Sequence, residues 1–199
     1  VRNEFIRLVG ELGKHSLADV EPILLAWGQH TDFGVRTSVG AALEQVVTDT
    51  SNVPDVLGLL ESWLVNYPPA DNSEGSTNVR WSVGASVWRI ISPQTNSQHI
   101  RRAIQVLRRL ALDNKPVAMS AAYALHKMVR HIRLAELRSV LDVLARRTDM
   151  GTSPHIVWAI NDAANPRLNN GFEPIQLLEH WLRLDNSQRK VFAFTAILS

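Results

Sequence analysis

The sequence predicts an all-α protein, a solenoid of about five two-helix repeats. Three observations lead to this fold class. A segment of small residues recurs, as VRTSVGAAL from Val35 and as VRWSVGASV from Val79. Amphipathic segments with larger side chains lie between such segments. Outside both kinds of segment, no stretch alternates apolar and polar residues over the length of a strand.

The small-residue helices are expected at regular intervals along the chain. Aligned on their first apolar residue, they begin at Val1, Val35, Val79, Val117, near His155 or Ile156, and at Val191. The first three steps are 34, 44 and 38 residues, and the remaining 74 residues make two further steps. These intervals bracket the period of roughly 40 residues that is typical of two-helix HEAT-type repeats.

The helices with larger side chains fill the intervals. We expect them over residues 20–30, 53–67, 100–112, 134–147 and 172–184. Each carries apolar residues three or four positions apart, as in the run from Leu134 to Leu144, and this spacing gives a helix one buried face. Pro22, Pro54 and Pro174 are expected near a helix start, where the missing N–H of proline costs little.

Turn and capping residues separate the predicted helices. Asp32-Phe33-Gly34 and residues 113–116 precede small-residue helices, while Asn169-Asn170-Gly171 precedes a helix with larger side chains. The segment from Pro68 to Asn78 is polar and accounts for the long 44-residue step. We interpret it either as an unstructured surface loop or as a loop that binds a partner.

Composition limits the classes of function. The formal net charge is only +2, and cysteine is absent, which excludes disulfides, thiolate nucleophiles and cysteine zinc sites. No apolar run is long enough to cross a bilayer and no signal sequence is recognisable, so we expect a soluble protein without a membrane partner. The absence of cysteine and of any Asn-x-Ser/Thr acceptor fits a cytoplasmic protein. Because both ends lie in or beside predicted helices, we interpret residues 1–199 as a single repeat domain taken from a larger protein.

The sequence contains no recognisable motif for a cofactor or a reaction. Its glycines form neither a phosphate-binding nor a dinucleotide-binding loop, and the Gly-x-Ser-x-Gly nucleophile motif is missing. The seven histidines form no metal motif. We expect His126 and His131 on a solvated basic face with Lys127, Arg130 and Arg133. The sequence therefore predicts no enzyme activity, no metal and no small-molecule cofactor.

A basic stretch is the clearest candidate binding surface. Between Arg101 and Arg147 there are eleven Lys and Arg residues and only three acids. Arg101 and Arg108 share one helix face, with Arg102 and Arg109 beside them. The candidate binding residues are Arg101, Arg102, Arg108, Arg109, Lys127, Arg130, Arg138, Arg146 and Arg147. Three interpretations of these residues are open. They bind the phosphates of a nucleic acid, they bind an acidic protein surface, or they form the solvated outer face of the solenoid.

The repeated segments resemble the HEAT-repeat family, through Asp32 before Val35-Arg36 and through the parallel Val79-Arg80. This resemblance implies a right-handed α-α superhelix. It also implies that Asp32, Arg36 and Arg80 belong to a ladder between neighbouring repeats. The ladder is expected to fade where Ala118 and Phe192 replace the arginine. Such surfaces bind proteins, peptides or nucleic acids.

Three functions follow, in order of preference. The first is a non-enzymatic scaffold or regulatory module that binds a protein partner or another domain of its parent chain. The second is nucleic-acid binding through the basic residues. The third function is base-excision catalysis, which a resemblance to the alkylpurine DNA glycosylases implies. Those enzymes are HEAT-like and use aromatic residues and an aspartate on their inner helices. Here Trp158 and Asp162 lie four apart on one predicted helix, and Trp81 and Trp88 are further aromatic candidates. Alternatively, Trp158 packs between repeats and Asp162 is solvated or caps a helix.

Three other tryptophans are expected to be structural. Trp27, Trp63 and Trp181 occupy similar places in their helices with larger side chains, in the segments AWGQH, SWLVNY and HWLRL. A large aromatic residue that recurs at one repeat position is typical of packing between repeats.

Overall fold

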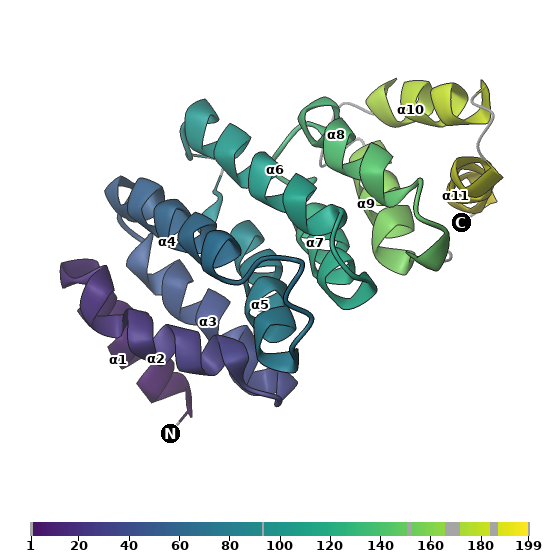
Figure 1. Cartoon of the computed structure of the whole chain (residues 1–199). Coiled ribbons are helices and arrows are strands. Elements are labelled where there is room, and N and C mark those ends of the chain that lie inside the picture. The colour runs from purple at the N-terminus through teal and green to yellow at the C-terminus, as the bar shows by residue number, and fades with distance from the viewer. Residues whose placement is uncertain (1, 93, 151–152, 166–171, 184–186, 199) are drawn as a thin grey trace. The chain divides into compact units, whose positions relative to one another are not determined.

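The computed structural model describes residues 2–92, 94–150, 153–165, 172–183 and 187–198. Over these residues the chain forms eleven α-helices and two short 3-10 helices, and it contains no strand (Figure 1). The all-α prediction is confirmed. None of these helices is both long enough and apolar enough to cross a bilayer.

Small-residue helices alternate with helices of larger side chains, in the predicted order. The first kind comprises α1 (Arg2–His15), α3 (Phe33–Val46), α5 (Glu74–Ile90), α7 (Lys115–Met128), α9 (Pro154–Ala164) and α11 (Ser187–Leu198). The second kind comprises α2 (Leu17–Gln29), α4 (Val53–Asn66), α6 (Ser97–Ala111), α8 (Leu134–Leu144) and α10 (Phe172–Arg183). The 3-10 helices η1 (Thr50–Asn52) and η2 (Thr148–Met150) precede α4 and α9.

Capping side chains fix where several helices begin. The side chains of Ser16, Asp32, Ser73 and Asn114 each accept a hydrogen bond from a backbone N–H three residues later. Asp32 and Asn114 were expected in this role. Ser16 starts α2 earlier than predicted, so Pro22 lies inside that helix instead of near its start. The predicted turn Asn169-Asn170-Gly171 lies outside the described residues.

The polar segment from Pro68 to Asn78 is not one loop. Its second half forms the first turn of α5, because Ser73 caps that helix and Glu74 lies at its positive end. The first half is held by Arg80, which is fully buried. The Arg80 guanidinium donates to the carbonyl oxygens of Pro68 and Asp71, at 3.1 and 3.0 Å. The interpretation as an unstructured loop is therefore wrong.

Residue contacts divide the chain into two compact units, 1–106 and 107–199, with the boundary inside α6. In the first unit α3 packs against both α1 and α5, and α2 packs against all three (Figure 1). The backbones approach closely at two glycines. A Cβ on Gly10 would lie 2.4 Å from Gln45 Cβ, and one on Gly40 would lie 3.2 Å from Ser86 Cα. Small residues therefore bring the odd-numbered helices together.

In the second unit α9 packs against α7, α8, α10 and α11. Alanines line α7, where Ala118, Ala121 and Ala122 are fully buried. Leu125, Leu137, Leu141, Ile156 and Ile160 complete the core around them. The short alanine side chains allow α7 and α9 to pack closely, and this approach positions the side chains of the candidate site.

One contact recurs in both units, between successive helices with larger side chains. Trp63 of α4 donates its indole N–H to Glu21 of α2, at 3.0 Å. Trp181 of α10 donates in the same way to Asp142 of α8, at 2.9 Å. Both indole rings are buried. The expectation that these two tryptophans are structural is confirmed, and Trp27 packs edge-to-face on Phe5.

Candidate functional site

Aromatic, acidic and basic side chains of α7 and α9 meet in the second unit, and we name this group the α7–α9 cluster. Its members are Tyr123, His126 and Lys127 of α7, Arg130 just after that helix, and His155, Trp158 and Asp162 of α9. On each helix these residues are spaced three or four positions apart, so they share one face. The close packing of α7 on α9 brings the two faces together.

Four rings form the centre of the cluster. The ring of His155 lies 5.3 Å from those of both Tyr123 and Trp158, each in an edge-to-face arrangement. It also stacks on the ring of His126, at 6.1 Å between centroids. The rings of His126 and Trp158 are 5.5 Å apart. Aromatic pairs at these separations attract one another, so the four rings hold each other in place.

Charged groups flank the rings. The Asp162 carboxylate lies 3.2 Å from His126 Nε2 and accepts a hydrogen bond from Arg130 Nε at 3.0 Å. The ammonium of Lys127 lies over the ring of Tyr123, 5.5 Å from its centroid. Trp158 is 47% exposed, whereas His126 is only 8% exposed. The cluster therefore combines an exposed indole ring with two cations.

Both histidines are neutral at neutral pH. Burial lowers the pKa of His126, and Asp162 opposes that effect while Lys127 and Arg130 add to it. Burial also lowers the pKa of His155, and the neighbouring His126 and Lys127 act in the same direction. Nε2 of His126 faces Asp162, and its other ring nitrogen, Nδ1, is closed to solvent. His126 and Asp162 therefore resemble an acid–base pair, but Nδ1 of His126 cannot reach a substrate.

The cluster corrects one expectation and leaves another open. His126 was expected on a solvated face, but it is buried because its ring packs on α9; His131, Arg130 and Arg133 are exposed as expected. Trp158 and Asp162 do lie in one cluster, as their spacing suggested. Trp81 and Trp88 belong to α5 in the first unit.

Tyr123 and His155 were not singled out from the sequence. The signal for them is a pair of aromatic residues three apart on each of two successive small-residue helices. Tyr123 and His126 form one pair, and His155 and Trp158 form the other. Large rings interrupt helices that otherwise carry small side chains, and that contrast marks the face on which the site lies.

Four of the nine candidate basic residues are paired with acids. Arg102 makes two bonds to the Glu61 carboxylate, at 3.1 and 2.8 Å, and this contact raises the pKa of the guanidinium. The other pairs are Arg130 with Asp162, Arg138 with Asp142, and Arg147 with Asp149. Their charges are compensated within the chain, so they contribute less to a positive surface than the sequence suggested.

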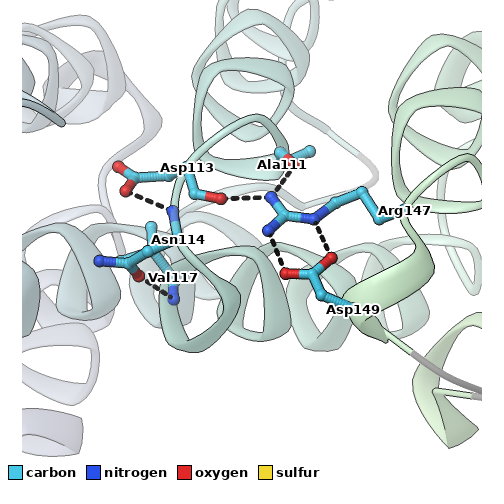
Figure 2. Close-up of polar contacts among 6 residues, drawn as sticks. All are labelled: Ala111, Asp113, Asn114, Val117, Arg147 and Asp149. Atoms are coloured by element: carbon cyan, nitrogen blue, oxygen red, sulfur yellow. Dashed lines mark hydrogen bonds and ion pairs between the residues drawn. The ribbon is translucent and has the colours of Figure 1, made fainter.

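Arg147 is the most deeply engaged of these four (Figure 2). Its guanidinium donates to the carbonyl oxygens of Ala111 and Asp113, and it makes two bonds to the Asp149 carboxylate at 2.9 and 2.6 Å. The Asp113 side chain accepts from the backbone N–H of Asn114, which in turn caps α7. Arg147 thus joins the end of α6, the start of α7 and η2, which is a structural role.

The remaining candidates are less engaged. Arg101, Arg108, Arg109 and Arg146 are exposed, and no acid in the described part of the chain is paired with them. Arg101 belongs to the first unit and the other three to the second. These four arginines, with Lys127, retain the positive charge that the sequence predicted.

The residues of the expected ladder bind mainly the turns before their own helices. Asp32 caps α3, and Arg36 donates to the carbonyl oxygens of His30 and Thr31 at 2.9 and 2.6 Å. Arg36 also lies over the ring of Trp81 on α5, 5.1 Å from its centroid. This link to the next small-residue helix uses an aromatic ring in place of a carboxylate. The ladder itself stays a prediction.

No group of three His, Asp or Glu side chains within the described ranges is placed to hold a metal ion. Comparisons of the chain with models of known protein families, with curated proteins and with solved structures find no match.

Proposed function

We propose that this chain is a non-enzymatic helical-repeat module, HEAT-like in architecture, that binds a protein partner or another domain of its parent chain. The proposed architecture is a right-handed α-α superhelix of about five two-helix repeats. The observation that carries the proposal is the recurring indole–carboxylate contact, Trp63 with Glu21 and Trp181 with Asp142. Its partners lie 42 and 39 residues apart in sequence, close to the period of about 40 residues of HEAT-type repeats.

A repeat of this kind explains why the helices alternate. In the first unit α1 packs on α3 and α3 on α5, in the second α7 packs on α9 and α9 on α11, and a tryptophan joins α2 to α4 and α8 to α10. In solenoids, neighbouring repeats bury one continuous core and leave a long surface for extended contact with other macromolecules.

Pairing of the arginines favours a protein over a nucleic acid as the partner. A phosphate backbone is bound by cations whose charge is not already neutralised, and binding weakens steeply with salt. Arg102, Arg130, Arg138 and Arg147 are each paired with a carboxylate of this chain. A protein surface of mixed charge fits such a pattern better than a polyanion does.

The test begins with the purified chain coupled to a support. Proteins retained from a cell extract are identified, produced separately and titrated into the chain by isothermal calorimetry. We expect saturable binding of a protein. Single- and double-stranded oligonucleotides are titrated in parallel at several salt concentrations. Oligonucleotide binding that falls steeply with salt, in the absence of any protein ligand, would replace this proposal with the nucleic-acid alternative.

Nucleic-acid binding is the second candidate because Arg108, Arg109 and Arg146 are exposed and no acid in the described ranges is paired with them. Arg108→Glu combined with Arg109→Glu should then weaken oligonucleotide binding strongly and reduce the salt dependence of the binding that remains. Arg7→Glu, at an exposed arginine of α1, is the matched control and should leave binding unchanged apart from a small nonspecific loss.

A further inference from the structure

The indole ring of Trp158 is exposed, unlike those of Trp63 and Trp181. Trp63 and Trp181 are buried and donate to carboxylates, whereas Trp158 is 47% exposed on a helix. Its ring is fixed by contacts with His155 and His126. A rigid, exposed indole loses little conformational entropy on binding, and tryptophan is among the residues that contribute most to protein interfaces.

The net charge of the α7–α9 cluster is positive. The cluster holds two cations, Lys127 and Arg130, and one carboxylate, Asp162, while both histidines are neutral. Arg130 is paired with Asp162. Lys127 has no acidic partner among the residues that the structure describes, and its ammonium lies over Tyr123. One positive charge of the cluster is therefore left uncompensated.

We propose that the α7–α9 cluster is a docking site for an acidic protein segment. The segment places one apolar side chain on the exposed face of Trp158 and a carboxylate beside Lys127. This inference rests on the proposed function, because it names the site and the partner chemistry of a protein-binding module. The indole supplies apolar contact area, and the lysine selects for negative charge.

A nucleic acid fits the same cluster less well. A strand that stacked a base on Trp158 would bring phosphates toward Asp162 as well as toward the cations, since the carboxylate lies one helical turn from the indole. Lys127 alone would have to neutralise the phosphates, because Arg130 is paired. A peptide can place carboxylates at the lysine and a neutral residue at Asp162, because the order of its side chains is free.

The test uses the full chain and short fluorescein-labelled synthetic peptides, followed by fluorescence anisotropy. One peptide is rich in Asp and Glu and carries a single Leu, the second replaces that Leu by Gly, and the third replaces the acids by Gln and Asn. A single-stranded oligonucleotide is the fourth probe. We expect the chain to bind the first peptide and to prefer it over the other three probes.

Three variants locate the site. Trp158→Ala should weaken binding of the first peptide by about tenfold or more. Lys127→Glu should weaken it and reduce its sensitivity to salt. Phe33→Ala removes another exposed aromatic ring, 62% exposed and in the first unit, and should leave binding unchanged. Because all three residues lie at the surface, circular dichroism should report unchanged folding.

Several results would overturn the docking site. They are equal binding by the Trp158→Ala chain, preference for the oligonucleotide, absence of peptide binding, or a Trp158-dependent dimer in sedimentation experiments. If the Trp158→Ala chain still retains the protein partner found by calorimetry, the proposed function stands and its binding surface lies elsewhere. If no protein binds the unaltered chain, both proposals fail together.

Discussion

The packing of α1 on α3 can be tested by one methyl group, added at Gly10. In a helix interior, Gly→Ala normally stabilises a protein by about 1 kcal/mol through helix propensity. A Cβ at Gly10 would stand 2.4 Å from Gln45 Cβ and 3.0 Å from the carbonyl oxygen of Ala42. Ordinary carbon contacts need about 3.5 Å or more, so α1 must move by about 1 Å or leave its groove.

Gly58 provides the matched control. It lies inside α4 of the same unit, and the atom nearest to its added Cβ is Arg102 Nη2 at 3.9 Å. The gain in helix propensity is common to both substitutions. The difference in unfolding free energy between the two variants therefore isolates the cost of overpacking, which is about 1–3 kcal/mol. We expect Gly58→Ala to be about 1 kcal/mol more stable than the parent chain and Gly10→Ala to be up to about 2 kcal/mol less stable, because the gain in helix propensity offsets part of the cost of overpacking.

The measurement is urea unfolding followed by far-ultraviolet circular dichroism, at equal protein concentration for all chains. The unfolding free energy of Gly40→Ala should fall between those of the two variants. The added Cβ would meet Arg89 Cδ, which belongs to a side chain that can rotate away, and Ser86 Cα, which belongs to the backbone and cannot. If Gly10→Ala is as stable as Gly58→Ala, α1 and α3 do not approach closely at this glycine.

Three further predictions concern the polar contacts. Trp63→Phe should lower the unfolding free energy by about 1.5–3 kcal/mol, because it removes a hydrogen bond to a charged group, and a cycle with Glu21→Gln should show that the two losses are coupled. Arg147→Met should lower the free energy of urea unfolding by about 2 kcal/mol. Arg146→Met, at an exposed neighbouring position, should change it by no more than about 0.5 kcal/mol. Equal effects of the two substitutions would contradict the structural role of Arg147. Burial holds the pKa of His126 below its usual value of about 6.5, so below that pH the unfolded chain binds more protons than the folded one. Thermal stability should therefore be greatest above about pH 6.5 and should decline as the pH falls toward the lower pKa of the folded chain. The decline should be shallower in His126→Gln.

The sequence was sufficient for the order of the helices because side-chain size alone separates the two kinds. It was less accurate at helix starts. Ser16 and Ser73 extend α2 and α5 backwards, and each is a serine whose capping role depends on local backbone geometry. The superhelix inferred from the repeat stays a prediction, because a period fixes neighbouring contacts and leaves longer-range geometry undetermined.

The candidate basic surface illustrates why a site is harder to predict than a fold. Counting charges from Arg101 to Arg147 includes only acids inside that window. Three of the acids that neutralise its arginines lie outside it: Glu61, Asp149 and Asp162. A repeat of about 40 residues brings such distant side chains together, so a local count overestimates the charge that remains on the surface.

A comparison of two tryptophans links the repeat to the proposed docking site. When the small-residue helices are aligned on Val79 and Ile156, Trp81 and Trp158 fall at the same position. In the first unit the ring of Trp81 meets Phe33 and Arg36, both at 5.1 Å, and is partly covered. In the second unit the rings of His126 and His155 contact the ring of Trp158, which remains 47% exposed. The repeat thus explains why a tryptophan stands at this position, while the neighbours of each ring decide whether it stabilises the stack or is open to a partner.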